Sequence, residues 1–186
     1  MSELQRLLEL AKNRDFVVLD TETTGLYDAE IVDIAIIDST GNVLLNELVQ
    51  PSKPIPTAAT LVHGITDEMV SESQMWLVLR GHVLDLLTAK NVIVYNADFD
   101  TKMLASTDAA FGCDVTKWLD IATWHCAMKA FAEYFGDWSE YHQFYKWKKL
   151  SYAAAQLGVP YSEHHRALLD CFATLAVVRQ MFKDHA

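Results

Sequence analysis

The stretch "FVVLDTETTGL", Phe16 to Leu26, begins as a buried strand and then turns acidic. Four consecutive apolar residues lead directly into Asp20-Thr21-Glu22. Because side chains alternate across a strand, Asp20 and Glu22 point to the same side. Two carboxylates so close together repel each other unless one is protonated or a cation lies between them. The stretch suggests a cation site at the end of a central strand, although a lone D-x-E pattern is more often a turn cap beside a solvated carboxylate.

The composition is that of an ordinary globular protein. The chain has 186 residues, of which 51% are apolar and 22% are charged, and we expect a single domain over residues 1–186. No apolar run approaches the ~20 residues that a membrane helix needs, so we expect no membrane association. The formal charge of -10 argues against bulk coating of nucleic acid, but it is compatible with a nuclease that grips only a strand end.

Cysteine usage indicates a reducing compartment. The chain has three cysteines, an odd number, and no C-x-x-C pair. This pattern favours neither a disulfide framework nor a zinc knuckle, and it predicts a cytoplasmic protein.

The apolar patterns predict an α/β fold with a mixed central sheet of five strands flanked by helices. Strands are expected at residues 16–20, on both sides of a turn at 39–42, at 91–95 and at 118–121. Helices are expected at residues 1–15, 66–89, 99–110, 123–135, 150–157 and 166–183. In such sheets ligands bind at the carboxyl ends of the strands, which is where the acidic residues of the opening stretch lie.

Two further segments bring carboxylates to structural junctions. In "VIVYNADFDTKML" a strand runs into Asp98 and Asp100, and Asp98 is the better candidate for a simple helix cap or surface residue. In "EHHRALLDCFATLAVV" Asp170 lies on the apolar side of the last helix, while His165 fits on the loop that enters it. Four carboxylates and one histidine are what two-metal hydrolysis of a phosphodiester requires, with the histidine as the base for the attacking water.

These motifs resemble those of the DEDDh (DnaQ-like) 3′–5′ exonucleases, which have a ribonuclease-H-like fold. The family includes the proofreading epsilon subunit of bacterial replicative polymerase, ribonuclease T and the TREX enzymes. The matching segments are "LDTETTGL", "YNADFDTKML" and "HRALLDC", with "HGIT" in the intervening loop. The resemblance extends from about Asp15 to Arg179.

The resemblance implies roles for individual residues. Two divalent cations, Mg²⁺ or Mn²⁺, are expected on four carboxylates, with Asp20 bridging both ions, Glu22 and Asp170 on the nucleophile side, and Asp100 on the other ion. His165 falls on the position of the general base, and the neighbouring His164 does not. The expected substrate-binding residues are Thr23, Thr24 and Leu26 around the terminal nucleotide, and His63 and Asn96 along the strand.

The resemblance therefore predicts a 3′–5′ exonuclease that releases nucleoside 5′-monophosphates from single-stranded or frayed DNA ends. A ribonuclease of the same family is the alternative, because no motif reveals how the site treats a 2′-hydroxyl. A non-catalytic module that binds strand ends, and a proofreading subunit with a polymerase partner, also remain open. Since little sequence follows the last predicted helix, we favour a stand-alone enzyme, or an exonuclease that acts in repair or in replication of a mobile element.

The segment 131–150 is longer and more aromatic than the usual connection in this family. Its aromatic residues and lysines suit a stacking surface for single strands, but packing of the rings onto the domain is the more frequent outcome and is the favoured prediction. Three other aspartates are predicted to be structural: Asp33 and Asp38 as solvated residues of the hairpin, and Asp120 as a helix cap.

Overall fold

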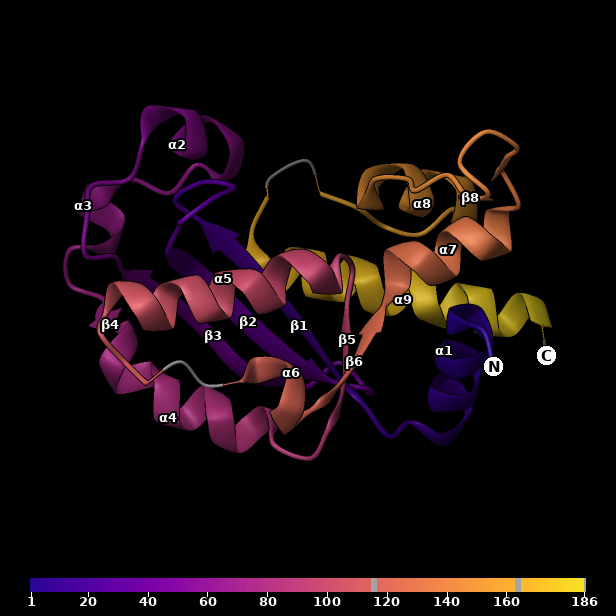
Figure 1. The fold of residues 1–186 in the computed structure, drawn as a ribbon, viewed down its shortest axis with the longest axis horizontal. Coiled ribbons are helices and arrows are strands. Elements are labelled where there is room, and N and C mark those ends of the chain that lie inside the picture. Colours follow the sequence, from indigo (N-terminus) through magenta and orange to yellow (C-terminus); the bar gives the residue numbers. More distant parts are fainter. Residues whose placement is uncertain (115–116, 163–164, 186) are drawn as a thin grey trace.

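The computed structural model describes residues 1–114, 117–162 and 165–185, and its centre is a twisted mixed sheet (Figure 1). Within the described residues the sheet has six strands in the order β4-β3-β2-β1-β5-β6. The strands are β1 (Val17–Thr23), β2 (Ile31–Asp38), β3 (Val43–Gln50), β4 (Gln74–Met75), β5 (Asn91–Val94) and β6 (Thr123–Cys126). The α/β class is confirmed, whereas the predicted number of five strands is wrong by one.

Strand β1 occupies the middle of the sheet, where antiparallel and parallel pairing meet. It pairs with β2 antiparallel and with β5 parallel, and β5 pairs with β6 parallel. Val17 and Leu19 contribute to the core on one face of the sheet, and Val18 to the core on the other. Burial on both faces explains why the sequence before Asp20 is a continuous apolar run without the alternation of a surface strand.

One face of the sheet is covered by helices from the two ends of the chain. They are α1 (Glu3–Asn13), α7 (Ala127–Phe135), α8 (Leu150–Leu157) and α9 (Ala167–His185). Cys171 of α9 contacts the backbone of β1 and β2, with its Sγ 3.7 Å from Val18 O and 3.4 Å from Ala35 O. Helix α9 therefore crosses the sheet directly over β1 and β2.

The other face is covered by α4 (Trp76–Leu87), α5 (Ala97–Ala110) and α6 (Trp118–Ile121), as Figure 1 shows. A buried carboxylate joins the three helices. Asp108 accepts hydrogen bonds from Trp76 Nε1 at 2.7 Å and Trp118 Nε1 at 3.0 Å, and its Oδ1 lies 2.7 Å from Arg80 Nε. The guanidinium balances a charge that would otherwise be expensive to bury.

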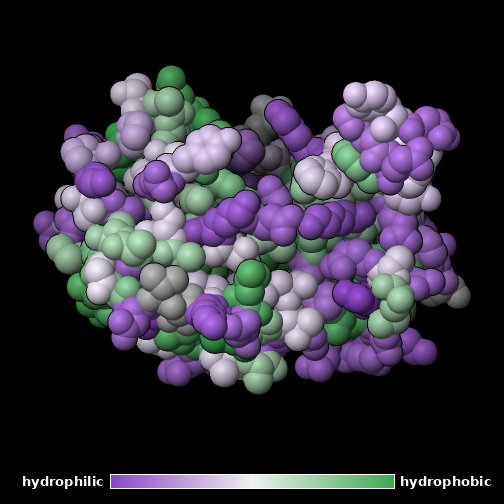
Figure 2. Space-filling view, in the orientation of Figure 1, coloured by the Kyte–Doolittle hydropathy of each residue, from purple (hydrophilic) through white to green (hydrophobic). Residues whose placement is uncertain are grey.

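Small lobes stand on either side of the edge of the sheet where β1 and β5 end (Figure 1). On one side are α2 (Thr57–His63) and α3 (Asp67–Val70). On the other is a hairpin formed by β7 (Trp138–Ser139) and β8 (Phe144–Tyr145). The outline of the molecule dips between these two lobes in the space-filling view (Figure 2). The carboxyl ends of the central strands point toward this side of the molecule (Figure 1).

Three predicted elements differ from the structure. Residues 118–121 form helix α6 and not a strand, and the strand β6 follows at 123–126, where the prediction places the start of a helix. The predicted helix 66–89 is divided into α3, β4 and α4, because the backbone at Gln74 and Met75 pairs with β3 and forms the edge strand of the sheet. No helix within the described residues is long and apolar enough to cross a membrane.

Candidate active site

The site begins on β1, which carries Asp20 and Glu22 at its carboxyl end. Both residues alternate with Thr21 and so share the face of Val18, which packs against the α9 side of the sheet. Glu22 lies opposite Asp33 of the neighbouring strand β2, and the pairing shifts its register immediately afterwards, between Glu22 and Thr23. Asp20 and Glu22 thus lie at the carboxyl end of β1, just before its regular pairing with β2 is interrupted.

The segment entering α9 supplies the histidine, and the first turn of the helix supplies a third carboxylate. Asp170 is buried, and its Oδ2 lies 3.4 Å from His165 Nδ1. Glu22, His165 and Asp170 each offer a ligand atom, and these atoms lie within 4.8 Å of one another. Glu22 is 143 positions before His165 in the chain, and the fold brings it together with His165 and Asp170, as the sequence predicts.

Helix α5 supplies the fourth carboxylate from the opposite face of the sheet. Asp100 is buried, and its Oδ1 accepts a hydrogen bond of 2.7 Å from the hydroxyl of Thr21. Thr21 lies between Asp20 and Glu22 on β1 and points to the α5 side. The hydroxyl of Thr21 on β1 thus fixes the orientation of the Asp100 carboxylate on α5. This role of Thr21 was not predicted from the sequence.

The carboxylates strongly influence one another's ionisation. Burial, followed by repulsion from Asp100 and Asp170, raises the pKa of Asp20 well above its usual value. Burial and the charges of Asp170 and Asp33 raise the pKa of Glu22 to about 8. Burial also raises the pKa of Asp100, against the opposing hydrogen bond from Thr21. Without positive charge, the ionised form of the cluster is unstable.

The donor set fits divalent cations. Asp170 Oδ1 is buried and has no hydrogen-bond partner among the described residues, although buried carboxylate oxygens are normally paired. Carboxylate oxygens are the ligands preferred by hard cations such as Mg²⁺ and Mn²⁺. An oxygen without a partner among the described residues, together with carboxyl groups whose pKa values are raised by burial and, for Asp20 and Glu22, by neighbouring carboxylates, is the arrangement expected of residues that share bound cations.

The position of Asp33 is the main difference between the predicted and the observed site. It was expected to be a solvated hairpin residue, but its side chain is only 1% exposed. Its Oδ2 lies 2.7 Å from Arg166 Nε and accepts a hydrogen bond of 3.3 Å from the backbone N–H of Ala167. Asp33 therefore attaches the start of α9 to the centre of the sheet, beside His165. Asp38 differs, because it lies near the surface and caps the hairpin turn.

The predicted substrate-binding residues surround the cluster but differ in exposure. Thr23 is buried and donates a hydrogen bond of 2.6 Å to Gly25 O, while Thr24 Oγ1 accepts one from Glu30 N. Leu26 is 70% exposed at the end of this turn. The turn after β1 is thus held by its own hydroxyl groups and presents an apolar side chain to solvent.

His63 and Asn96 occupy the two flanks of the site. His63 ends α2, and its Nδ1 accepts a hydrogen bond of 3.0 Å from Ile65 N. Burial lowers the pKa of His63, with the nearby backbone of Thr23 acting in the opposite direction. Asn96 precedes the first residue of α5, and its side chain does not cap the helix. Both residues remain predictions for substrate contact.

The remaining acidic residues stay outside the cluster. Asp98 is an exposed residue of the first turn of α5 that pairs with Lys129 at 2.7 Å, as expected for a surface residue. Asp120 lies within α6, and so the prediction that it caps the next helix is wrong. His164 lies outside the described residues.

Comparison with known proteins gives the family. The sequence model of the exonuclease family matches residues 17–178, which include all four carboxylates and His165. The chain belongs to the exonuclease family. The predicted membership of the DEDDh exonucleases is confirmed.

Two curated relatives support the assignment. This exonuclease is 43% identical over 176 residues to an exonuclease of Escherichia phage 186, covering 92% of this chain and 90% of that protein. It is 30% identical over 166 residues to exodeoxyribonuclease 10 of Escherichia coli K12, covering 87% of this chain and 66% of that protein. The prediction that the chain is an exonuclease is therefore confirmed.

Solved structures support the fold. Exonuclease X, solved in complex with 5′-overhanging duplex DNA, has a TM-score of 0.65 to this exonuclease at 25% identity, covering 91% of this chain and 92% of that one. Exonuclease I has a TM-score of 0.73 at 19% identity, covering 91% of this chain and 42% of that one. The ribonuclease-H-like fold expected from the motifs is confirmed, with six strands in the sheet.

Proposed function

We propose that this exonuclease domain, residues 1–186, removes nucleotides from the 3′ ends of DNA and releases nucleoside 5′-monophosphates. The observation that carries the proposal is the cluster in which Glu22, Asp170 and His165 meet, beside the half-buried Asp20 and the buried Asp100. The relatives add support for the substrate, since one is named as an exodeoxyribonuclease and a structural neighbour is in complex with DNA.

We propose Asp20, Glu22, Asp100 and Asp170 as the ligands of two divalent cations, Mg²⁺ or Mn²⁺. When bound, such ions lower the pKa of water and stabilise negative charge on a phosphate undergoing displacement. Support comes from the unpaired oxygen of Asp170 and from the raised pKa values of the cluster. Thr21 holds Asp100 in place for this role through its 2.7 Å hydrogen bond.

His165 is the proposed general base. Its Nδ1 faces Asp170 Oδ2 at 3.4 Å, which leaves Nε2 to accept a proton from the attacking water. The water oxygen forms a bond to the terminal phosphorus and the bond from phosphorus to the 3′-oxygen of the preceding nucleotide breaks. That oxygen takes a proton from solvent, and the released product carries the phosphate on its 5′ carbon. Asp170 orients the imidazole through this contact.

The decisive experiment uses oligonucleotides labelled at the 5′ end, as DNA and as RNA of the same sequence, with Mg²⁺ or Mn²⁺. We expect progressive shortening of the DNA from its 3′ end and nucleoside 5′-monophosphates as products. Asp100→Ala and His165→Ala are expected to lose at least about 10²-fold in kcat. Asp98→Ala is the matched control from the same motif and should retain activity, because Asp98 is exposed and pairs only with Lys129.

Two outcomes would overturn the proposal. Preferential shortening of RNA would favour the ribonuclease alternative, and full activity of Asp100→Ala would contradict the proposed metal site.

From the sequence we also propose a cytoplasmic location and a role in DNA repair or proofreading. The three free cysteines, Cys113, Cys126 and Cys171, agree with a reducing compartment.

A further inference from the structure

The β7–β8 hairpin and the segment after it expose large aromatic rings. We call residues 138–149 the aromatic hairpin. Tyr141 is 88% exposed, Trp147 is 55% exposed and Phe144 is 42% exposed. The sequence-based expectation that these rings pack onto the domain is therefore wrong for all three. Exposed aromatic rings gathered in one segment are more often an interaction surface than a packing feature.

Three of the rings stand in a row. The centroids of His142 and Phe144 are 5.3 Å apart with 25° between the planes, and those of Phe144 and Trp147 are 5.6 Å apart with 26° between the planes. Trp138 and Tyr145 make a separate edge-on contact across the hairpin and hold its two strands together. The row therefore presents a preformed series of nearly parallel rings, the arrangement on which nucleobases stack.

Lysines give this segment positive charge in a chain whose formal charge is -10. Lys146 and Lys148 both bind Asp137, at 3.1 and 2.6 Å, and Lys148 also lies 5.5 Å from the ring centres of Phe135 and Tyr152. These two lysines thus stabilise the base of the hairpin. Lys149 forms no ion pair with the described residues, so its charge is available to an anionic ligand.

The aromatic hairpin is fixed to the edge of the sheet that carries the active site. Tyr95 follows β5 and precedes Asn96, and its hydroxyl donates a hydrogen bond of 2.8 Å to the backbone oxygen of Lys148. The hairpin stands on one side of the carboxyl ends of the central strands (Figure 1). The aromatic hairpin and the acidic cluster therefore lie at the same edge of the sheet.

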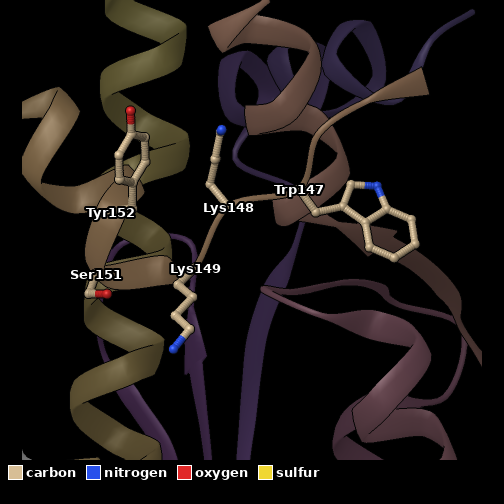
Figure 3. Close-up of a pocket in the computed structure, with 5 residues that line it drawn as sticks. All are labelled: Trp147, Lys148, Lys149, Ser151 and Tyr152. Carbon is tan, nitrogen blue, oxygen red and sulfur yellow. The ribbon is translucent and has the colours of Figure 1, made fainter. Parts of the chain in front are cut away.

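An open pocket of about 530 Å³ lies at the base of the hairpin and is lined by Trp147, Lys148, Lys149, Ser151 and Tyr152. Figure 3 shows that Lys149 and Lys148 point in opposite directions and that Trp147 projects away from both. The exposed ring of Trp147 and the ammonium group of Lys149 thus line the same pocket while pointing away from each other. Rings for bases and cations for phosphates are the two elements of single-strand binding sites.

We propose that the aromatic hairpin binds the single-stranded part of the DNA that precedes the 3′ end in the active site. The bases stack on the row ending at Trp147, and Lys149 contacts the backbone phosphate. This proposal rests on the proposed 3′–5′ activity and adds a binding surface outside the catalytic cluster. It predicts that the enzyme prefers strands long enough to reach from the cluster to the hairpin.

The test compares a dinucleotide with a 20-nucleotide single strand as substrates. Trp147→Ala and Phe144→Ala should lower kcat/KM on the long strand by about tenfold, the loss expected when one stacking ring is removed. Hydrolysis of the dinucleotide should not change, because that substrate occupies only the active site. Equal rates for the variants and the wild type on the long strand would overturn the proposal, as would equal losses on both substrates.

Binding of a fluorescently labelled single strand in EDTA tests the surface without catalysis. We expect Trp147→Ala to weaken binding about tenfold and Trp147→Phe, which keeps a ring, to restore most of it. The two proposals can fail separately. An enzyme that hydrolyses neither substrate would refute the proposed exonuclease activity. Weaker binding by Trp147→Ala would still support the aromatic hairpin as a binding surface for DNA. Unchanged binding would indicate a protein partner for the hairpin and overturn a DNA site.

Charge provides a second, independent readout. Lys149→Ala should reduce the slope of log affinity against log salt by about 0.7, the value for one phosphate contact on a single strand. Lys90→Ala is the matched control, because Lys90 is exposed and lies at the amino end of β5, at the opposite edge of the sheet. An identical slope for Lys149→Ala and the wild type would contradict the assigned phosphate contact.

Discussion

Arg166 Nε lies 2.7 Å from Asp33 Oδ2, so the residue directly after His165 is attached to the central sheet by a buried carboxylate. The same oxygen accepts the backbone N–H of Ala167, the first residue of α9. Both contacts restrict the segment that carries His165, which places Asp33 and Arg166 as positioning residues for the base. Side chains that support catalytic groups in this way affect rate through geometry.

Replacing Arg166 is therefore expected to lower kcat more than it changes KM. Arg166→Ala leaves the carboxylate of Asp33 buried without its partner, and we expect a loss of about 10- to 100-fold in kcat. Arg166→Lys should recover only part of it, because lysine cannot reproduce the directed Nε contact. Steady-state kinetics on a labelled strand measure both parameters. A double-mutant cycle with Asp33→Asn should show non-additive effects, and additive losses would contradict the coupling.

Thr21 is expected to control metal affinity through Asp100. Thr21→Val keeps the shape of the side chain and removes the 2.7 Å hydrogen bond to Asp100 Oδ1. Groups that orient metal ligands typically contribute 10- to 100-fold, so the Mg²⁺ concentration for half-maximal activity should rise about tenfold. Thr101→Val is the matched control from α5, the helix that carries Asp100, because Thr101 Oγ1 donates to the backbone oxygen of Ala97 and not to Asp100. Equal Mg²⁺ curves for the two variants would refute this role.

The metal-free protein is expected to lose stability as pH rises. Burial and neighbouring charges raise the pKa of Glu22 from 4.5 to about 8, so the folded state holds a proton that the unfolded chain has already released. Between these two pKa values the free energy of unfolding falls with increasing pH. In EDTA, Tm should be lower at pH 8.5 than at pH 5.5 by about 5 °C or more.

Two additions make this measurement specific to the site. Mg²⁺ added at pH 8.5 should raise Tm, because cations bind the folded cluster and not the unfolded chain. Glu22→Gln should show a weaker dependence on pH, since it removes one of the titrating groups. A Tm that is independent of both pH and Mg²⁺ would contradict the proposed cation site.

Asp108 is expected to be important for stability and not for catalysis. It is fully buried and is bound by Arg80, Trp76 and Trp118 on the α4–α6 side of the sheet. Asp108→Ala removes the buried carboxylate that accepts from Arg80 and from both indole N–H groups, and it should cost about 3–5 kcal/mol in urea unfolding. The exposed Asp120→Ala should change the free energy of unfolding by less than about 0.5 kcal/mol. A loss below about 1 kcal/mol for Asp108→Ala would contradict this view.

The parts of the fold that the sequence predicts are those with a strong local pattern. The continuous apolar run before Asp20 predicts β1, and the turn at residues 39–42 predicts the pairing of β2 with β3. Strand β4 consists of Gln74 and Met75, both exposed, and a two-residue edge strand has no alternation to detect. The predicted strand at 118–121 failed because Trp118 is buried in a single helical turn, where periodicity cannot be judged.

The acidic cluster was predictable because each carboxylate follows a recognisable junction of the chain. The supporting residues were not. Asp33 meets Arg166 across 133 positions of sequence, and Thr21 meets Asp100 across 79. Nothing local distinguishes Asp33 from a solvated aspartate of a hairpin, since its burial results from α9 crossing the sheet. Pairing between distant elements is decided by tertiary packing, which a local pattern does not contain.

The placement of His165 and Asp170 at the start of α9 has a consequence for synthesis of the protein. A growing chain that has not yet reached residue 165 can already contain β1, β5 and α5, with Asp20, Glu22 and Asp100. It still lacks the proposed base and one metal ligand, and Asp33 has no arginine to bind. If the proposed roles hold, we expect partially synthesised chains on the ribosome to be inert toward DNA until α9 docks on the sheet.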